Sequence, residues 1–168
     1  QLFLNELGLP QQYHHFKFIY WTKQEGIYDQ LKTIVEAQGK DFKKEYENLF
    51  VSSTIAKAIL DLKPGFAENE AKVKENFKAN FKRIESINRE QLIDTIKTEI
   101  LPLFYGDKIP LTLIVLDEVQ QFIGSEGNKS IDVQNLAQDL CSNFDSKFLL
   151  IGTGQNSLSE TSLLQRLQ

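Results

Sequence analysis

The sequence has very little cysteine and no long apolar run. Of its 168 residues only Cys141 carries a thiol, so the chain forms no internal disulfide and no cysteine-rich metal site. The mean hydropathy is -0.31, and no apolar stretch approaches the roughly 18 residues that a membrane span needs. No signal-peptide pattern opens the chain. These absences predict a cytoplasmic protein with no membrane association.

The chain also lacks a basic excess and methionine. Nineteen Lys and Arg stand against 23 Asp and Glu, a formal net charge of -4, so direct nucleic-acid binding is not indicated. With 41% hydrophobic residues, the chain has enough apolar material for a packed core. It begins at Gln1, contains no Met, and ends at Gln168 within a helical pattern. We therefore expect it to be a piece of a longer protein.

Apolar residues recur at helical spacing through residues 1–106, and this part is predicted to be a mainly helical segment. Residues 13–22 are ambiguous, because their aromatic and β-branched content favours a strand while the flanking residues favour a helix. A helix is our prediction there. The apolar residues expected to line one face of each helix form four sets: Ile27, Leu31, Ile34 and Val35; Phe42, Tyr46, Leu49 and Phe50; Val73, Phe77, Phe81 and Ile84; and Leu92, Ile93, Ile96, Ile100 and Leu103.

Two local signals bound the last of these helices. Asn88 stands three residues before Gln91, a spacing that indicates a capping box. Pro102 has no amide hydrogen and its ring crowds the preceding turn, so we expect it to end or kink the helix.

Residues 107–168 show a different pattern, typical of a strand, a helix and a second strand. The run Leu111–Leu116 is continuously apolar, which predicts a strand buried on both faces in a parallel sheet, and Phe148–Ile151 predicts a second. Between them a helix is expected, with Ser130 as its N-cap. Its apolar stripe comprises Val133, Leu136, Ala137, Leu140, Cys141 and Phe144, so Cys141 is interpreted as a packing residue. The predicted fold class is α/β, with at least two parallel strands joined by a crossover helix.

The first strand ends in two carboxylates, Asp117 and Glu118. An apolar strand followed by Asp-Glu is the Walker B pattern, in which the strand holds the Asp where it can bind a nucleotide-bound Mg2+. The adjacent Glu can then polarise the water that attacks the γ-phosphate of ATP. The alternative is that both residues only end a strand and begin a solvated loop. From the pattern alone the two interpretations have about equal weight.

The second strand leads into a polar, glycine-rich stretch that favours the first interpretation. In P-loop ATPases the strand beside Walker B ends in a polar residue near the γ-phosphate, the sensor 1 position, and Thr153 and Gln155 are the candidates here. Arg166 lies where related ATPases often place an arginine that reaches a neighbouring subunit's nucleotide. The alternative for Thr153 and Gln155 is an ordinary strand-to-helix turn capped by Ser157 or Ser159.

The phosphate-binding loop itself is missing from these 168 residues. The pattern G-x-x-x-x-G-K-S/T does not occur, and the one Gly-Lys pair, Gly39-Lys40, is followed by Asp41. We therefore expect this chain alone neither to bind nor to hydrolyse ATP appreciably. His14 and His15 are adjacent, so their side chains are expected to diverge, and no third residue stands at a spacing that predicts a metal site.

The strand ends resemble a known family. The stretch LTLIVLDEVQQFIG at Leu111–Gly124, with Asp132–Leu136 and Leu150–Gln155, is similar to the Walker B to sensor 1 region of the large P-loop ATPase of BREX-type phage-defence systems. The N-terminal phrases Lys23–Tyr28, Ser52–Leu60 and Leu62–Gly65 resemble the helical segment that those proteins insert between P-loop and Walker B.

The resemblance implies a bacterial or archaeal ATPase that uses ATP and Mg2+ and acts with other defence proteins, including a DNA methyltransferase. Self-association of its ATPase modules is also implied. Asp117 would be the Mg2+ carboxylate, Glu118 the general base, and Thr153 or Gln155 the sensor. Two alternatives remain: a helical protein-interaction module with a vestigial Walker B, and a nucleic-acid-remodelling ATPase of another lineage.

Overall fold

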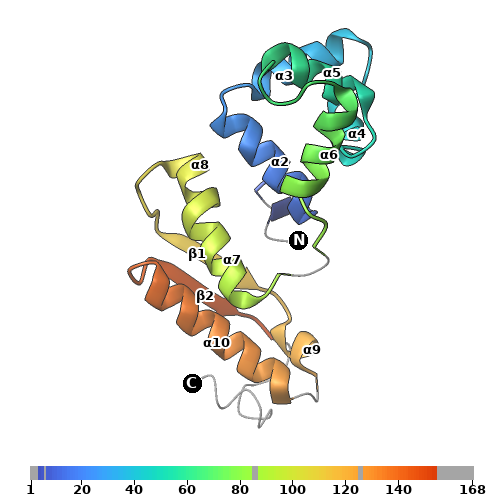
Figure 1. Cartoon of the computed structure of the whole chain (residues 1–168). Helices are drawn as coiled ribbons and strands as arrows, with labels where there is room; N and C mark the ends of the chain where they lie inside the picture. The colour runs from blue at the N-terminus through green and yellow to red at the C-terminus, as the bar shows by residue number, and fades with distance from the viewer. Residues whose placement is uncertain (1–3, 6, 85–86, 125–126, 155–168) are drawn as a thin grey trace. The chain divides into compact units, whose positions relative to one another are not determined.

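The computed structural model describes residues 4–5, 7–84, 87–124 and 127–154. The chain divides into two compact units, Gln1–Ser86 and Ile87–Gln168 (Figure 1). The first is helical, and the second combines helices with a two-stranded parallel sheet. The protein is therefore a mixed α/β protein, as the sequence predicts. The helices between Arg89 and Tyr105 belong to the second unit together with the strands.

The described part of the first unit folds as a succession of short helices. The predicted helical segments are confirmed, and the ambiguous stretch at residues 13–22 is a helix. Within this unit α5 packs against both α3 and α6. The bounds are α2 Tyr13–Gln24, α3 Tyr28–Ala37, α4 Phe42–Glu47, α5 Ser53–Leu62 and α6 Glu70–Asn80.

Aromatic side chains from α2 and α6 form the centre of this unit's core. The ring of Phe18 meets those of Phe77 and Phe81 edge-on, at centroid distances of 5.4 and 5.6 Å. Trp21 packs on the same rings and on Phe66 from the loop before α6. Offset and edge-on geometries let the positive ring edge meet the negative ring face. The apolar residues spaced along α2 and α6 thus pack together in one aromatic core.

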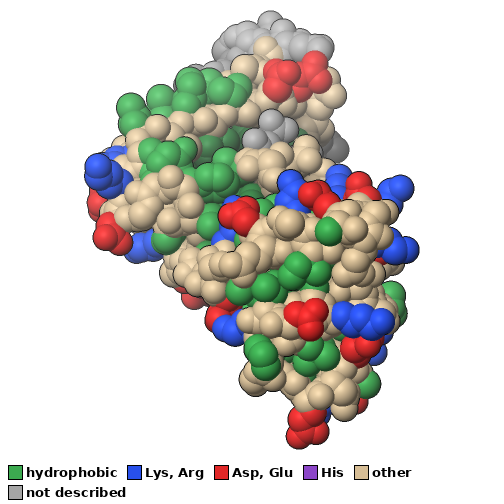
Figure 2. All heavy atoms as spheres, turned by 90° about the horizontal axis from the view of Figure 1, so that it is seen from above, with side chains coloured by type: hydrophobic (Ala, Val, Ile, Leu, Met, Phe, Trp, Pro, Cys, Tyr) green, Lys and Arg blue, Asp and Glu red, His purple; other side chains and the backbone are tan. Residues whose placement is uncertain are grey.

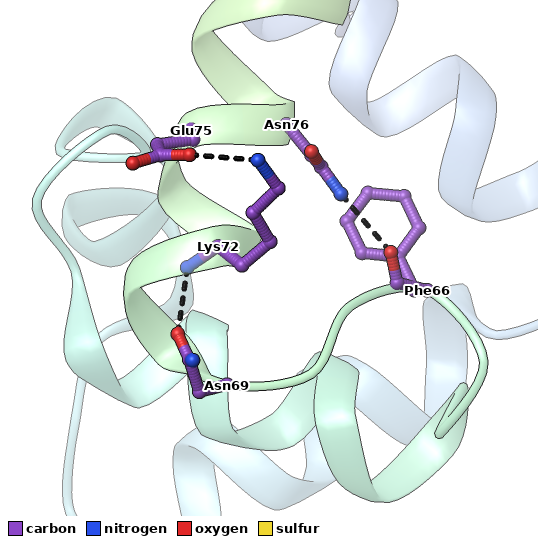
Figure 3. A network of polar contacts seen from close by, with 5 residues as sticks. All are labelled: Phe66, Asn69, Lys72, Glu75 and Asn76. Atoms are coloured by element: carbon purple, nitrogen blue, oxygen red, sulfur yellow. Dashed lines mark hydrogen bonds and ion pairs between the residues drawn. The ribbon is translucent and has the colours of Figure 1, made fainter.

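Side-chain caps set where these helices begin. Asn69 Oδ1 accepts a hydrogen bond from the Lys72 amide at 2.9 Å, and Asn76 on α6 donates to the carbonyl of Phe66 at 3.0 Å (Figure 3). The loop is therefore tied to the helix at two points. Ser52 caps α5 in the same way, because its hydroxyl accepts from the Ile55 amide at 3.0 Å. Such caps satisfy amides that have no partner within the helix.

The second unit begins with a helix that changes type along its length. α7 (Arg89–Thr95) starts at the predicted capping box of Asn88 and Gln91, and is followed by a π-helical turn, η1 (Ile96–Ile100), and by α8 (Leu101–Tyr105). The Leu101 amide donates to the carbonyl of Ile96, five residues back.

Pro102 therefore does not end the helix. It lies in the first turn of α8, directly after the wider turn, and the helix continues to Tyr105. A proline in a regular helix removes one amide donor and crowds the carbonyl four residues earlier. The π-helical turn directly before Pro102 has wider hydrogen-bond spacing, and it covers the residues whose carbonyls the proline ring would crowd in a regular helix.

The predicted strand–helix–strand unit is confirmed. β1 (Thr112–Leu116) pairs in parallel with β2 (Phe148–Gly152), in a register that puts Leu116 opposite Gly152. Two helices connect them: α9 (Val119–Ile123), which the sequence analysis did not predict, and α10 (Gly127–Asn143). α10 packs on β2 (Figure 1). The assignment of Ser130 as N-cap is wrong, since α10 begins at Gly127 and Ser130 is buried inside it.

The prediction that both faces of the strands are buried is also wrong. The face toward the helices carries Leu116 and Leu150, packed against Val119, Ile123 and Val133. The opposite face is exposed, because no other described element covers it. Its side chains are Leu113, Val115, Leu149 and Ile151, with 57%, 54%, 56% and 42% of their surface exposed.

Cys141 is exposed as well, so its interpretation as a packing residue is wrong. The neighbouring residue Leu140 is buried. Cys141 is rotated from it by about 100° around the helix axis, and its side chain is exposed. Its sulfur lies 3.6 Å from the Ser146 hydroxyl.

The surface carries both signs of charge. On the face drawn in Figure 2, Lys and Arg side chains are interspersed with Asp and Glu, and neither sign forms a single field. No helix in the described part of the chain is long and apolar enough to cross a membrane. The mixed charges on the face in Figure 2 add no support for nucleic-acid binding.

The cap of α6 yields a first prediction. Asn69→Ala removes the acceptor of the Lys72 amide and should lower the free energy of unfolding by about 1 kcal/mol. Urea unfolding followed by Trp21 fluorescence measures this, since Trp21 is the chain's one tryptophan and lies in the same core. Asn69→Asp keeps an acceptor and should unfold close to the wild-type midpoint. Equal midpoints for the Ala and Asp variants would contradict the capping role.

Candidate functional site

The carboxyl ends of the two strands bring together residues that are 36 positions apart in the sequence. The hydroxyl of Thr153, directly after β2, donates a hydrogen bond to Oδ1 of Asp117, directly after β1. Since the strands are parallel, both ends meet at the same edge of the sheet. The same hydroxyl accepts a hydrogen bond from the Glu118 amide at 3.0 Å. Thr153 thus joins both carboxylate residues.

Backbone hydrogen bonds hold Thr153 in this position. Its amide donates to the carbonyl of Leu116 at 2.9 Å, and its carbonyl accepts from the amide of Val119 at 3.0 Å. The ladder between the two strands therefore continues one residue beyond the sheet. The threonine hydroxyl is placed by main-chain pairing rather than by a flexible loop.

Glu118 has an unusual backbone conformation. Its φ and ψ angles are 50° and 40°, the left-handed region that non-glycine residues rarely adopt. Its amide is held by Thr153 Oγ1 and by Asp117 Oδ1, each at 3.0 Å. Such a conformation costs about 1–3 kcal/mol and persists where the surrounding contacts impose it. At this turn the chain passes from β1 into α9.

Two glycines at the end of β2 allow α9 to approach closely. A Cβ placed on Gly152 would lie 3.1 Å from Cγ1 of Val119, and one on Gly154 would lie 2.4 Å from Oε1 of Gln120. A side chain at either position would therefore push against the first turn of α9. Gln120 is part of the site's wall, and the sequence analysis missed it. Its position two residues after the Asp-Glu pair was the available signal.

The donor atoms at this edge are those that Mg2+ prefers. Asp117 supplies a carboxylate and Thr153 a hydroxyl, both hard oxygen ligands, and Mg2+ is commonly bound by one or two such groups together with substrate phosphates and water. Among the described residues, no cluster of three or more His, Cys, Asp or Glu side chains could hold a metal without such help. The residues present fit a metal that arrives with a nucleotide.

The site is open to solvent. Both Asp117 and Thr153 are exposed, and Glu118 is half-buried. The reason is that only two strands and the helices on one face surround it in the described part of the chain. Of the predicted site residues, the structure brings together Asp117, Glu118 and Thr153. Gln155 and Arg166 lie outside the described residues.

A second polar cluster lies in the helical unit, where the sequence analysis expected none. The rings of His14 and His15 do not diverge, since their centroids are 4.1 Å apart, and both side chains are buried. His14 stacks on Phe50 at 5.5 Å, and His15 meets the ring of Tyr46 edge-on at 5.9 Å. Adjacent positions on a helix differ by about 100°, but the two rings stay in contact with each other while each packs on its own aromatic neighbour.

Burial lowers the pKa of both rings and so disfavours their charged forms. It lowers the pKa of His15 to about 4, with the neighbouring His14 ring adding to the effect, while a hydrogen bond to the Glu47 backbone raises it slightly. Burial also lowers the pKa of His14, and the positive charge of Arg83 lowers both. A neutral imidazole offers one donor and one acceptor nitrogen.

Comparison with known proteins gives no match: no family model, no curated protein and no solved structure is similar to this chain.

The Thr153 hydroxyl leads to a second prediction. Thr153→Val removes one acceptor of the Glu118 amide, so hydrogen exchange of that amide should accelerate about fivefold, corresponding to about 1 kcal/mol. NMR-detected exchange measures it. The Val119 amide bonds the backbone carbonyl of residue 153 and serves as an internal reference. Thr153→Ser should exchange like the wild type, and an unchanged Glu118 amide in the Val variant would show that the hydroxyl does not hold the turn.

The histidine pair leads to a third prediction. The unfolded chain protonates His15 near pH 6.5 but the folded chain only near pH 4, so stability should fall as the pH drops through this window. His15→Gln cannot titrate, and its urea midpoint should fall less steeply. The variant keeps all carboxylates and the groups that face His15, namely His14, Tyr46, Glu47 and Arg83. The difference between the two proteins in how steeply the urea midpoint falls with pH therefore reports His15 alone. Parallel slopes would contradict the assignment.

Proposed function

We propose that this chain carries the Walker B and sensor 1 part of a P-loop ATPase, preceded by a helical segment. The observation that carries the proposal is the hydrogen bond of Thr153 to Asp117 across two parallel strands. A solvated loop after a strand gives no reason for this contact. An ATPase does, because its metal-binding carboxylate and its sensor must both reach the γ-phosphate region.

The residues divide the work according to their positions. Asp117, immobilised by the strand and by Thr153, is the carboxylate that binds Mg2+ directly or through water. When bound, Mg2+ and ATP supply charge neutralisation and the phosphoryl group. Glu118 follows Asp117 in a left-handed turn, and it accepts the proton of the attacking water. Thr153 orients Asp117 and senses the state of the nucleotide.

The exposed sheet face favours a larger sheet in the complete domain. Parallel strands are nearly always covered on both faces, and β1 and β2 leave one apolar face open within the described residues. Further strands and a helix layer would cover it, and the same segment would bring the missing phosphate-binding loop. The likeness of residues 111–155 to BREX-type phage-defence ATPases then suggests a cytoplasmic role in such a system. Other defence proteins, including a DNA methyltransferase, would be its partners.

Two other functions give different expectations. A protein-interaction module with a vestigial Walker B has no need of the contacts that hold Glu118 in its strained turn, so these favour the ATPase. A nucleic-acid-remodelling ATPase of another lineage would share the same strand ends, and the mixed surface charge does not favour it.

The test uses the protein that combines this chain with a P-loop. Glu118→Gln should abolish steady-state ATP hydrolysis while ATP binding stays within about twofold of wild type, since it removes the base and keeps the shape. Asp132→Asn, which removes an exposed carboxylate on α10, is the matched control and should retain turnover.

The outcomes separate the hypotheses. Retained turnover in Glu118→Gln contradicts the general-base role. A wild-type protein that binds no ATP contradicts the ATPase proposal as a whole and favours the interaction module.

A further inference from the structure

The helical unit contains a cavity of about 1100 Å3 beside the histidine pair. Residues from three places in this unit line it: the segment Gly8–Gln12 before α2, the α4 residues Lys43, Tyr46 and Glu47, and Arg83 after α6. A cavity of this volume can take a small organic molecule.

One buried atom in the cavity wall has no partner. His14 lines the cavity with only 6% of its surface exposed, and within the described part of the chain its Nδ1 makes no hydrogen bond. Buried polar atoms are rarely left in this state, because the lost hydrogen bond to water is not replaced. Nδ1 itself has almost no exposed surface, so a ligand in the cavity would replace this bond once the ring turns Nδ1 toward it.

Two cations, Arg83 and Lys43, and one carboxylate, Glu47, line the cavity in the described part of the helical unit. Among the described residues, neither Arg83 nor Lys43 lies within ion-pair distance of a carboxylate, although both line the cavity. The Arg83 guanidinium lies 5.2 Å from the centre of the Phe50 ring, the ring on which His14 stacks. Stacking restrains its planar fork, which leaves its N–H groups available for a bidentate anion.

From these observations we infer that the cavity binds a small organic anion, whose carboxylate or phosphate group is held by Arg83 and Lys43 while a polar atom pairs with His14 Nδ1. The site is chemically opposite to the strand ends, where Asp117 and Glu118 prefer a cation. It is therefore a separate binding site, and it does not depend on the ATPase proposal.

Binding has a spectroscopic consequence. An anion beside Arg83 offsets the positive charge that lowers the histidine pKa values, so occupancy should raise them toward their ordinary value. The charged and titratable groups that face the two rings are Arg83, Lys43, Tyr46 and Glu47. The imidazole NMR signals thus report both occupancy and charge.

The experiment titrates the whole chain with inorganic phosphate and, separately, with citrate, each against sodium chloride of matched ionic strength. We expect saturable shifts of the His14 and His15 ring signals that chloride does not produce. Arg83→Gln should weaken binding about tenfold or more, because it removes the charge-assisted pair. Lys44→Gln removes an exposed cation on the same helix α4 that does not line the cavity, and it should bind like the wild type.

His14→Phe keeps a ring on Phe50 but removes Nδ1, and it should weaken binding about fivefold, followed through the His15 signals. If only phosphate saturates, the ligand carries a phosphate group. If only citrate saturates, the ligand carries a carboxylate group. If both saturate, the site recognises the anion chemistry that the two share. If neither anion saturates beyond the chloride reference, or if Arg83→Gln binds as tightly as the wild type, the inference is overturned.

Discussion

The parallel pairing of β1 with β2 is the constraint on which the candidate site depends. Its register places Leu116 opposite Gly152, so the next residues of both strands, Asp117 and Thr153, meet at one edge. The main chain of Thr153 then continues the ladder, and its hydroxyl reaches the carboxylate. A shift of one residue would turn every side chain of the strand to the other face and separate the pair.

The turn after β1 shows that this edge is built at a cost. Glu118 occupies a left-handed conformation, and Gly154 leaves room for Gln120, so the first turn of α9 can close over the end of β2. Strain of this kind is kept where contacts over-determine it, and such places are often functional. The framework of the site is ordered in this way, while its solvent-facing side is open.

The helical unit solves a different problem, because it buries two histidines without charging them. His14 and His15 lie among aromatic rings, and the aromatic core formed by α2 and α6 stabilises the helix that carries them. A polar pair in such a place weakens the fold unless it is satisfied, so its position beside a cavity with Arg83 links stability to binding. Stability and ligand recognition then depend on the same few side chains.

The sequence by itself determined the local elements: helical spacing predicted α3, α4 and α6, the capping box of Asn88 predicted the start of α7, and two apolar runs predicted the parallel strands. These follow from short-range rules of periodicity and capping. The tertiary structure alone decided which strand face is covered, that Cys141 is exposed, that α9 forms, and that the two histidine rings converge. Each of these depends on what lies opposite a side chain in space, and spacing along one chain does not contain that information.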